Sequence, residues 1–159
     1  MILLQTQIFP FDNLEWKIFI ADKISHEILP KEIDFNELTE ITGNVPIMIT
    51  FLEQAIRESI STTSVVNIKQ SIKKMHQCAL LYYKNRVFSI FKKNVIAKEQ
   101  AENYAFVMDI FNNKEITNIP ESWNVLGIFQ SKISLSGEGS YCPINKSAYE
   151  AILSCLDEK

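Results

Sequence analysis

Glycine is scarce in this sequence, with four residues among 159, well below the usual share of about 7%. Glycine-rich phosphate loops and large, turn-rich β architectures need more of it, so both are disfavoured. The patterns HExxH, GxSxG, GxxxxGK(S/T), GxGxxG and DxDxDG are also absent, and these are common carriers of metal, nucleophile and nucleotide chemistry. The sequence therefore predicts a protein that is not an enzyme and that uses no cofactor or metal.

Cysteine and histidine are few as well, with three and two residues. Cys78, Cys142 and Cys155 form no close pair, which argues against a disulfide framework. His26 and His76 lie too far apart in the sequence for a closed zinc site. We interpret the cysteines as reduced thiols and the histidines as surface or structural residues. Cys142 alone is expected in a loop, and it lacks the nearby base that a nucleophilic cysteine needs.

A basic leader and long apolar runs are missing too. The first nine residues carry no lysine or arginine, and their apolar run is too short for a signal peptide. No uncharged stretch reaches the ~18 residues of a membrane span. Together with reduced thiols, these absences predict a soluble, cytoplasmic protein with no membrane partner.

The composition itself is that of a globular protein, with 47% hydrophobic and 22% charged residues. A chain of this length buries roughly 70% of its unfolded surface and folds without covalent staples. We predict a single globular domain over residues 1–159. Its fold class is mainly α, a bundle of about five to six helices, with two or three short β-strands in the N-terminal and C-terminal segments.

Capping residues indicate where the helices begin and end. Asp12 precedes Glu15, and Asp34 precedes Glu37, by the three residues of a capping box. Gly43 is placed to end the second of these helices. Pro30 is expected to stop the first helix, and Asn44 is expected to cap the helix that has Pro46 in its first turn. A short helix is expected to begin at Pro120 and Glu121. The last helix is expected over 146–156, capped by Asn145, with Ala148, Ile152 and Cys155 facing inward.

Two long helices are expected to supply the core. After a polar hinge at 59–64, apolar residues recur at steps of three and four from Val65 to Tyr82, which is a heptad-like seam. The second helix is expected over 97–113 and to be buried on most sides. The predicted core residues are Val65, Ile68, Ile72, Met75, Ala101, Tyr104, Ala105 and Met108.

Two segments have strand character. Residues 2–9 alternate weakly between apolar and polar side chains. Ile133 and Leu135, followed by Gly137, Gly139 and Tyr141, have the pattern of a β-hairpin.

The net charge of −3 conceals a strong segregation of charge along the chain. Residues 1–60 carry a net charge of −6, residues 61–100 carry +7, and residues 101–159 carry −4. The basic segment interleaves lysines with aromatic residues, a combination that binds nucleic acid. However, the chain as a whole is acidic, with a pI near 5.4, so we favour lysines that are solvated or paired with acids of the same chain.

The acidic first third has two interpretations as well. It is either a solvated face or a surface that steers toward a basic protein partner. We predict a non-catalytic protein-binding protein that inhibits a basic partner, of the immunity-protein or antitoxin type, and that neutralises a toxin such as a nuclease by mimicking phosphate charge. The predicted partner-binding residues are Glu32, Asp34, Glu37, Glu40, Glu53 and Glu58.

Two other classes of function stay open from the sequence. The basic segment 69–98 would suit a nucleic-acid-binding regulator or a small enzyme, although we consider nucleic acid the weaker interpretation. The seam from Val65 to Tyr82 would suit a helical adaptor or assembly subunit. The oligomeric state does not follow from the sequence.

Overall fold

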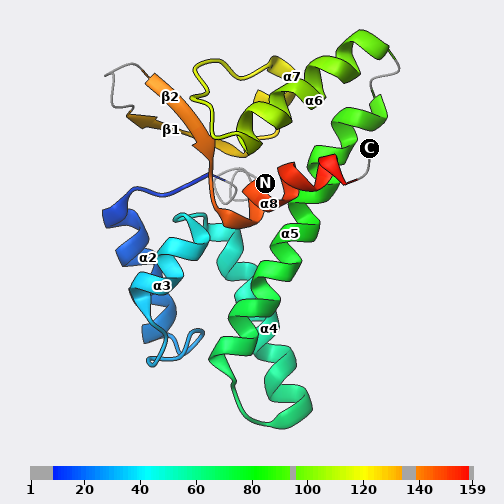
Figure 1. The fold of residues 1–159 in the computed structure, drawn as a ribbon. Coiled ribbons are helices and arrows are strands. Elements are labelled where there is room, and N and C mark those ends of the chain that lie inside the picture. Colours follow the sequence, from blue (N-terminus) through cyan, green and yellow to red (C-terminus); the bar gives the residue numbers. More distant parts are fainter. Residues whose placement is uncertain (1–8, 94–95, 134–138, 158–159) are drawn as a thin grey trace. The chain divides into compact units, whose positions relative to one another are not determined.

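The computed structural model describes residues 9–93, 96–133 and 139–157. Within them lie seven α-helices, one short 3₁₀ helix and a two-stranded antiparallel sheet (Figure 1). The prediction of a mainly α fold with a few short strands is confirmed. The chain divides into two compact units, residues 1–79 and 80–159, and each is described by itself.

Unit 1 contains α2 (Asn13–Ser25), α3 (Phe35–Thr42), α4 (Pro46–Thr63) and the first half of α5 (Ile68–Lys93). Side-chain caps start two of these helices as predicted. Asp12 and Glu15 form a capping box at α2, and Asp34 accepts hydrogen bonds from the first turn of α3. Gly43 ends α3 with a φ of 61°, a left-handed conformation that glycine adopts without steric cost.

The predicted cap at Asn44 is wrong. Val45 occupies the N-cap position of α4, and Pro46 follows in the first turn. The Asn44 side chain instead donates to the Phe11 carbonyl and to Asn13 Oδ1, at 3.2 Å each. Asn44 therefore ties the start of α4 to the start of α2.

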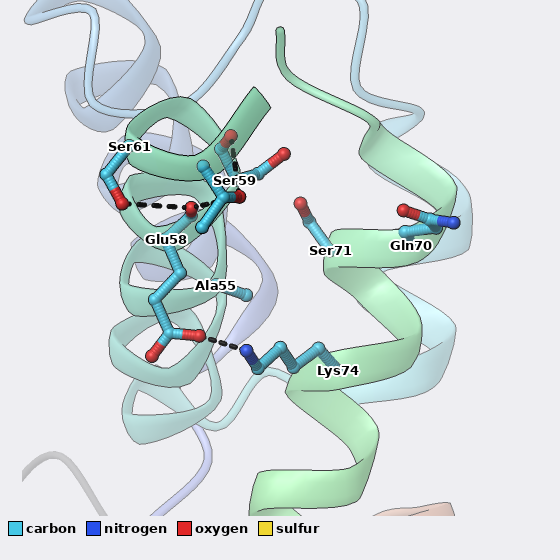
Figure 2. A pocket seen from close by; sticks show the side chains of 8 residues that line it. Ala55, Glu58, Ser59, Ser61, Gln70, Ser71 and Lys74 are labelled. Carbon is cyan, nitrogen blue, oxygen red and sulfur yellow. Dashed lines mark hydrogen bonds and ion pairs between the residues drawn. The ribbon is translucent and has the colours of Figure 1, made fainter. Parts of the chain in front are cut away.

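The polar hinge predicted at 59–64 is mostly helical, since α4 continues to Thr63. Hydroxyl groups of this segment donate back to carbonyls of the preceding turn, so they fit within a helix. The turn into α5 begins at Ser64, which has a φ of 60°. Helices α4 and α5 then run antiparallel, side by side (Figures 1 and 2).

The seam of α5 begins later than predicted, and buried residues continue beyond Tyr82. Val65 is 66% exposed and Ile68 is half-buried, so neither is a core residue. Ile72, Met75 and Ala79 are buried as predicted. In the second half of α5 the buried residues are Tyr83, Val87 and Ile90 rather than Tyr82, because a straight α-helix drifts away from a strict heptad repeat.

Unit 2 contains the rest of α5, α6 (Ala97–Phe111), α7 (Glu121–Asn124), β1 (Phe129–Ile133), β2 (Gly139–Pro143), α8 (Lys146–Leu153) and η1 (Ser154–Leu156). The hairpin prediction is confirmed for its strands, with Phe129 opposite Pro143 and Ser131 opposite Tyr141. Residues 134–138, including Leu135 and Gly137, and the predicted strand at 2–8 lie outside the described residues.

The C-terminal helix follows its prediction closely. Asn145 caps α8, with its Oδ1 accepting from the Ala148 N–H at 2.8 Å. Ala148, Ile152 and Cys155 are buried. A short helix at Glu121 is also present, as α7.

The predicted inward face of α6 is wrong. Ala101 and Ala105 are exposed, Met108 is 40% exposed, and Tyr104 is half-buried. The buried residues are Asn103, Phe106, Val107 and Ile110. Trp123 accounts for this choice of face, since its Nε1 donates to Asn103 Oδ1 at 3.0 Å and its ring lies 5.1 Å from that of Phe106.

None of the described helices combines the length and apolar character needed to cross a membrane.

Candidate protein-binding site

Unit 1 presents an acidic segment at residues 27–40, which comprise the loop between α2 and α3 and most of α3. It carries five carboxylates and one lysine, Lys31. Four of the predicted partner-binding residues lie in it, and all four are exposed: Glu32, Asp34, Glu37 and Glu40. In the part of the chain that the structure describes, no ion pair engages these four.

Helix α3 holds this segment in a defined conformation. Asp34 Oδ1 accepts from the N–H groups of Asn36 and Glu37, at 3.0 and 3.2 Å. Trp16 of α2 is buried, and its Nε1 donates to Thr39 Oγ1 at 2.9 Å. Glu37 and Glu40 lie three residues apart, so their carboxylates share one face of the helix. The acidic side chains are thus presented from a fixed backbone.

Glu53 and Glu58, the other two predicted contact residues, lie on α4 in a different electrostatic setting. Glu53 Oε1 lies 2.8 Å from Lys23 Nζ, and Arg57 lies 3.6 Å from the other oxygen. The Glu53 side chain is only 12% exposed. Glu58 forms an ion pair with Lys74 of α5. Both carboxylates are therefore neutralised by basic groups of the same chain, unlike those of α3.

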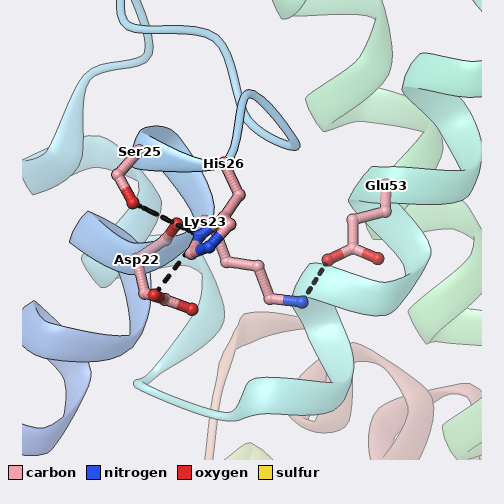
Figure 3. A network of polar contacts seen from close by, with 5 residues as sticks. All are labelled: Asp22, Lys23, Ser25, His26 and Glu53. Atoms are coloured by element: carbon pink, nitrogen blue, oxygen red, sulfur yellow. Dashed lines mark hydrogen bonds and ion pairs between the residues drawn. The ribbon is translucent and has the colours of Figure 1, made fainter.

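Figure 3 shows the pair between Lys23 and Glu53 beside a second polar group at the end of α2. There His26 Nδ1 lies 2.9 Å from the Asp22 carbonyl and 3.3 Å from its carboxylate. The His26 ring is exposed and contacts its own helix end, which matches its interpretation as a surface residue. His76 is half-buried on α5.

Some side chains of the basic segment form polar contacts within the fold. The hydrogen bond and the charge of Glu58 raise the pKa of Lys74 above its ordinary value. Arg86 donates to Tyr82 Oη and to the Leu126 carbonyl, at 3.1 Å each. Lys69 and Lys73 are exposed. One half of our preferred interpretation, pairing within the chain, is thus observed at Lys74.

The three cysteines are reduced thiols. Cys142 belongs to strand β2 and is half-buried, so its predicted placement in a loop is wrong. Among the described residues, no group of three or more His, Cys, Asp or Glu side chains is arranged to hold a metal ion.

Two features near these residues escaped sequence reasoning. Ile28, an apolar side chain within the acidic segment, is 40% exposed. A hollow of about 350 Å³ also opens between α4 and α5, and Ser59, Ser71 and Lys74 are among its lining residues (Figure 2). No pattern in the sequence marks this hollow, because it depends on how the two helices pack.

No family model, curated protein or solved structure matches this chain.

Proposed function

We propose that this protein is a non-catalytic inhibitor that binds a basic protein partner through the acidic segment of unit 1. The partner class that fits is a toxin such as a nuclease, whose phosphate-binding cleft attracts carboxylates as it attracts phosphates. In this role the protein acts in the cytoplasm, as immunity proteins and antitoxins do, and reduced thiols suit that compartment.

The observation that carries the proposal is the contrast between two sets of carboxylates. Glu53 and Glu58 are neutralised by basic side chains of unit 1. The two exposed carboxylates of α3, Glu37 and Glu40, have no such partner in the described residues. Unpaired like charges on one helix face repel each other modestly, and a basic partner would relieve that repulsion. Their field would also speed encounter with such a partner.

Affinity capture from the source cells, followed by binding kinetics, tests the proposal. The variant is Glu37→Lys/Glu40→Lys, measured against the captured protein at two salt concentrations. The matched control is Glu99→Lys/Glu102→Lys on α6. Both pairs are exposed, three residues apart, and begin at the third position of a helix. The two variants therefore change net charge and helix-dipole interactions equally.

We expect the α3 variant to slow association on the order of tenfold at low salt, and the slowing to shrink at 0.15 M, where screening acts over ~8 Å. The α6 control should slow association much less, and the α3 variant should also inhibit the partner's activity less well. Equal effects of the two variants would show that net charge alone matters. Unchanged association rates for both would remove the acidic segment from the mechanism.

A further inference from the structure

The outward face of α6 carries an apolar stripe that is largely exposed. Its residues recur at alternating steps of four and three, which is the spacing of a coiled-coil seam over two heptads. Met108 is 40% and Phe111 is 51% exposed, and the two alanines of the stripe are exposed as well. Such spacing is typical of a helix face that packs against another helix. We call this stripe the α6 seam, and it consists of Ala97, Ala101, Tyr104, Met108 and Phe111.

Two hollows extend this apolar surface onto neighbouring elements of unit 2. Tyr104 and Phe91 of α5 are among the residues that line a hollow of about 220 Å³. Phe111 lines a second hollow, of about 430 Å³, together with Leu80 of α5 and Leu153 of α8. All of these residues belong to unit 2. A helix lying on the α6 seam would therefore also place its longer side chains beside apolar walls.

The α6 seam is complementary in size to itself when two copies run antiparallel. Its first half has the small residues Ala97 and Ala101, and its second half has the large residues Met108 and Phe111. Antiparallel pairing about the middle of the seam places Phe111 of one copy against Ala101 of the other, and Met108 against Tyr104. Large side chains then fill the space beside small ones, as in a packed core. Parallel pairing would instead place Phe111 against Phe111 and leave a gap between the alanines.

The charges beside the seam allow two copies to approach each other. Ala105 marks one edge of the seam, and Lys98 and Glu102 lie along that edge, both exposed. Asp109 lies on the same edge and pairs with Lys114 at 3.4 Å. These four charges sum to zero, and the seam itself carries none. A strongly acidic or basic partner gains little attraction here, whereas a second copy meets no net repulsion.

We propose that the chain forms a symmetric homodimer through the α6 seam, with the two α6 helices antiparallel. The contact is isologous, so both copies use the same stripe. Helix α6 has 15 residues and is about 22 Å long, and an interface of this extent falls below the ~1,200 Å² of a standard one. We therefore expect a Kd of about 10–100 μM. The dimer is independent of the acidic segment on α3, and it dissociates at the lower concentrations used for the binding kinetics of that segment.

Sedimentation velocity of the full chain over about 5–500 μM tests the dimer. The wild type should change from 18.3 kDa toward twice that mass as its concentration rises. Met108→Glu places an unpaired charge at the centre of the interface and should raise the Kd about tenfold or more, as should Phe111→Glu. The matched control is Leu81→Glu on α5, because Leu81 is likewise an apolar residue exposed on a helix of unit 2. It should leave the Kd unchanged, and all three variants should keep the urea midpoint of the dilute wild type.

Cysteine crosslinking tests the antiparallel arrangement. Ala105 lies close to the middle of the seam, so Ala105→Cys should form a disulfide between copies under mild oxidation. Ala97 lies about nine residues from that middle, which places its two copies about 27 Å apart in an antiparallel pair. Ala97→Cys should therefore crosslink no more than the wild type, whose three native cysteines give the background.

Three results would overturn the proposal. A monomer at every concentration would show that the α6 seam binds no second copy. A dimer that Met108→Glu leaves intact would use another surface. Equal crosslinking of Ala97→Cys and Ala105→Cys would show that the two helices are parallel.

Discussion

Tyr83 gives the sharpest quantitative prediction of how this fold responds to pH. It lies on α5 within unit 2 and is 2% exposed. Its hydroxyl oxygen accepts a hydrogen bond from Asn145 Nδ2 at 3.2 Å, and Asn145 in turn caps α8. Burial disfavours the ionised phenolate and raises the pKa of Tyr83 from 10.0 to about 12, although the Asn145 hydrogen bond opposes the shift.

The raised pKa implies that folding is weakened at high pH. Below the unfolded pKa of 10.0, Tyr83 is neutral in both states and its contribution to stability is complete. Between pH 10 and pH 12 the unfolded chain loses this proton more readily than the folded one, so stability falls. A shift of about two units corresponds to roughly 3 kcal/mol in full, of which about 2 kcal/mol is lost by pH 11.5.

Tyr83→Phe isolates this effect from all other titrations. At pH 8 the variant should be less stable than the wild type by about 1 kcal/mol, because Asn145 loses its acceptor. At pH 11.5 the order should reverse, since phenylalanine has no proton to lose. Urea unfolding at both pH values, followed by circular dichroism, measures the two free-energy differences. A difference of the same sign and size at both would refute the assignment of a buried, raised-pKa tyrosine to this position.

Other predictions concern packing and capping. Ile110→Ala should lower the free energy of unfolding by roughly 2–5 kcal/mol, and Met108→Ala by less than ~1 kcal/mol, because only Ile110 is buried; equal losses in urea unfolding would contradict the observed face of α6. Ile72→Ala should cost a similar 2–5 kcal/mol, and a loss below ~1 kcal/mol would show that the α5 seam is poorly packed. Asp34→Ala should cost about 0.5–2 kcal/mol and Asp34→Ser should recover most of it; no loss in Asp34→Ala would show that the cap contributes nothing to α3.

Features determined by neighbouring residues could be predicted from the sequence. The cap at Asp12, the stop at Gly43 and the cap at Asn145 depend on side chains bonding to backbone groups within a few residues. The hairpin and the inward face of α8 also follow from local alternation and periodicity. These elements fix the fold class.

Features that depend on distant residues were missed. The buried face of α6 is determined by Trp123, which lies twenty residues away from its partner Asn103 in the sequence. Because the polar residue Asn103 is buried on this face, the apolar periodicity of the helix does not identify it. The Asn44 side chain donates to the Phe11 carbonyl instead of capping its own helix. The same limit applies to the candidate site. The acidic residues could be selected by sequence, but the pairing of Glu58 with Lys74 required the packing of α4 against α5.

Charge pairing also bears on the alternative function, binding of nucleic acid by the basic segment. Of its eight basic residues, Lys74 is paired with Glu58 and Arg86 is bonded to the Leu126 carbonyl. Lys69 and Lys73 lie one turn apart on the exposed side of α5, a spacing that would allow contact with two phosphates.

The salt dependence of binding, which reflects counterion release, distinguishes a protein with two phosphate contacts from a dedicated nucleic-acid-binding protein. Two phosphate contacts predict a slope near −2 for log K against log salt, so affinity for duplex DNA falls only about tenfold from 50 to 200 mM salt. A dedicated nucleic-acid-binding protein with 6–10 contacts loses about 10³–10⁵ over the same range. We therefore expect a labelled oligonucleotide to bind weakly, with a shallow slope that Lys69→Ala/Lys73→Ala abolishes. A slope of −6 or steeper would require the rest of the basic segment to contact phosphates together, and it would make nucleic acid, rather than a basic protein, the partner of this chain.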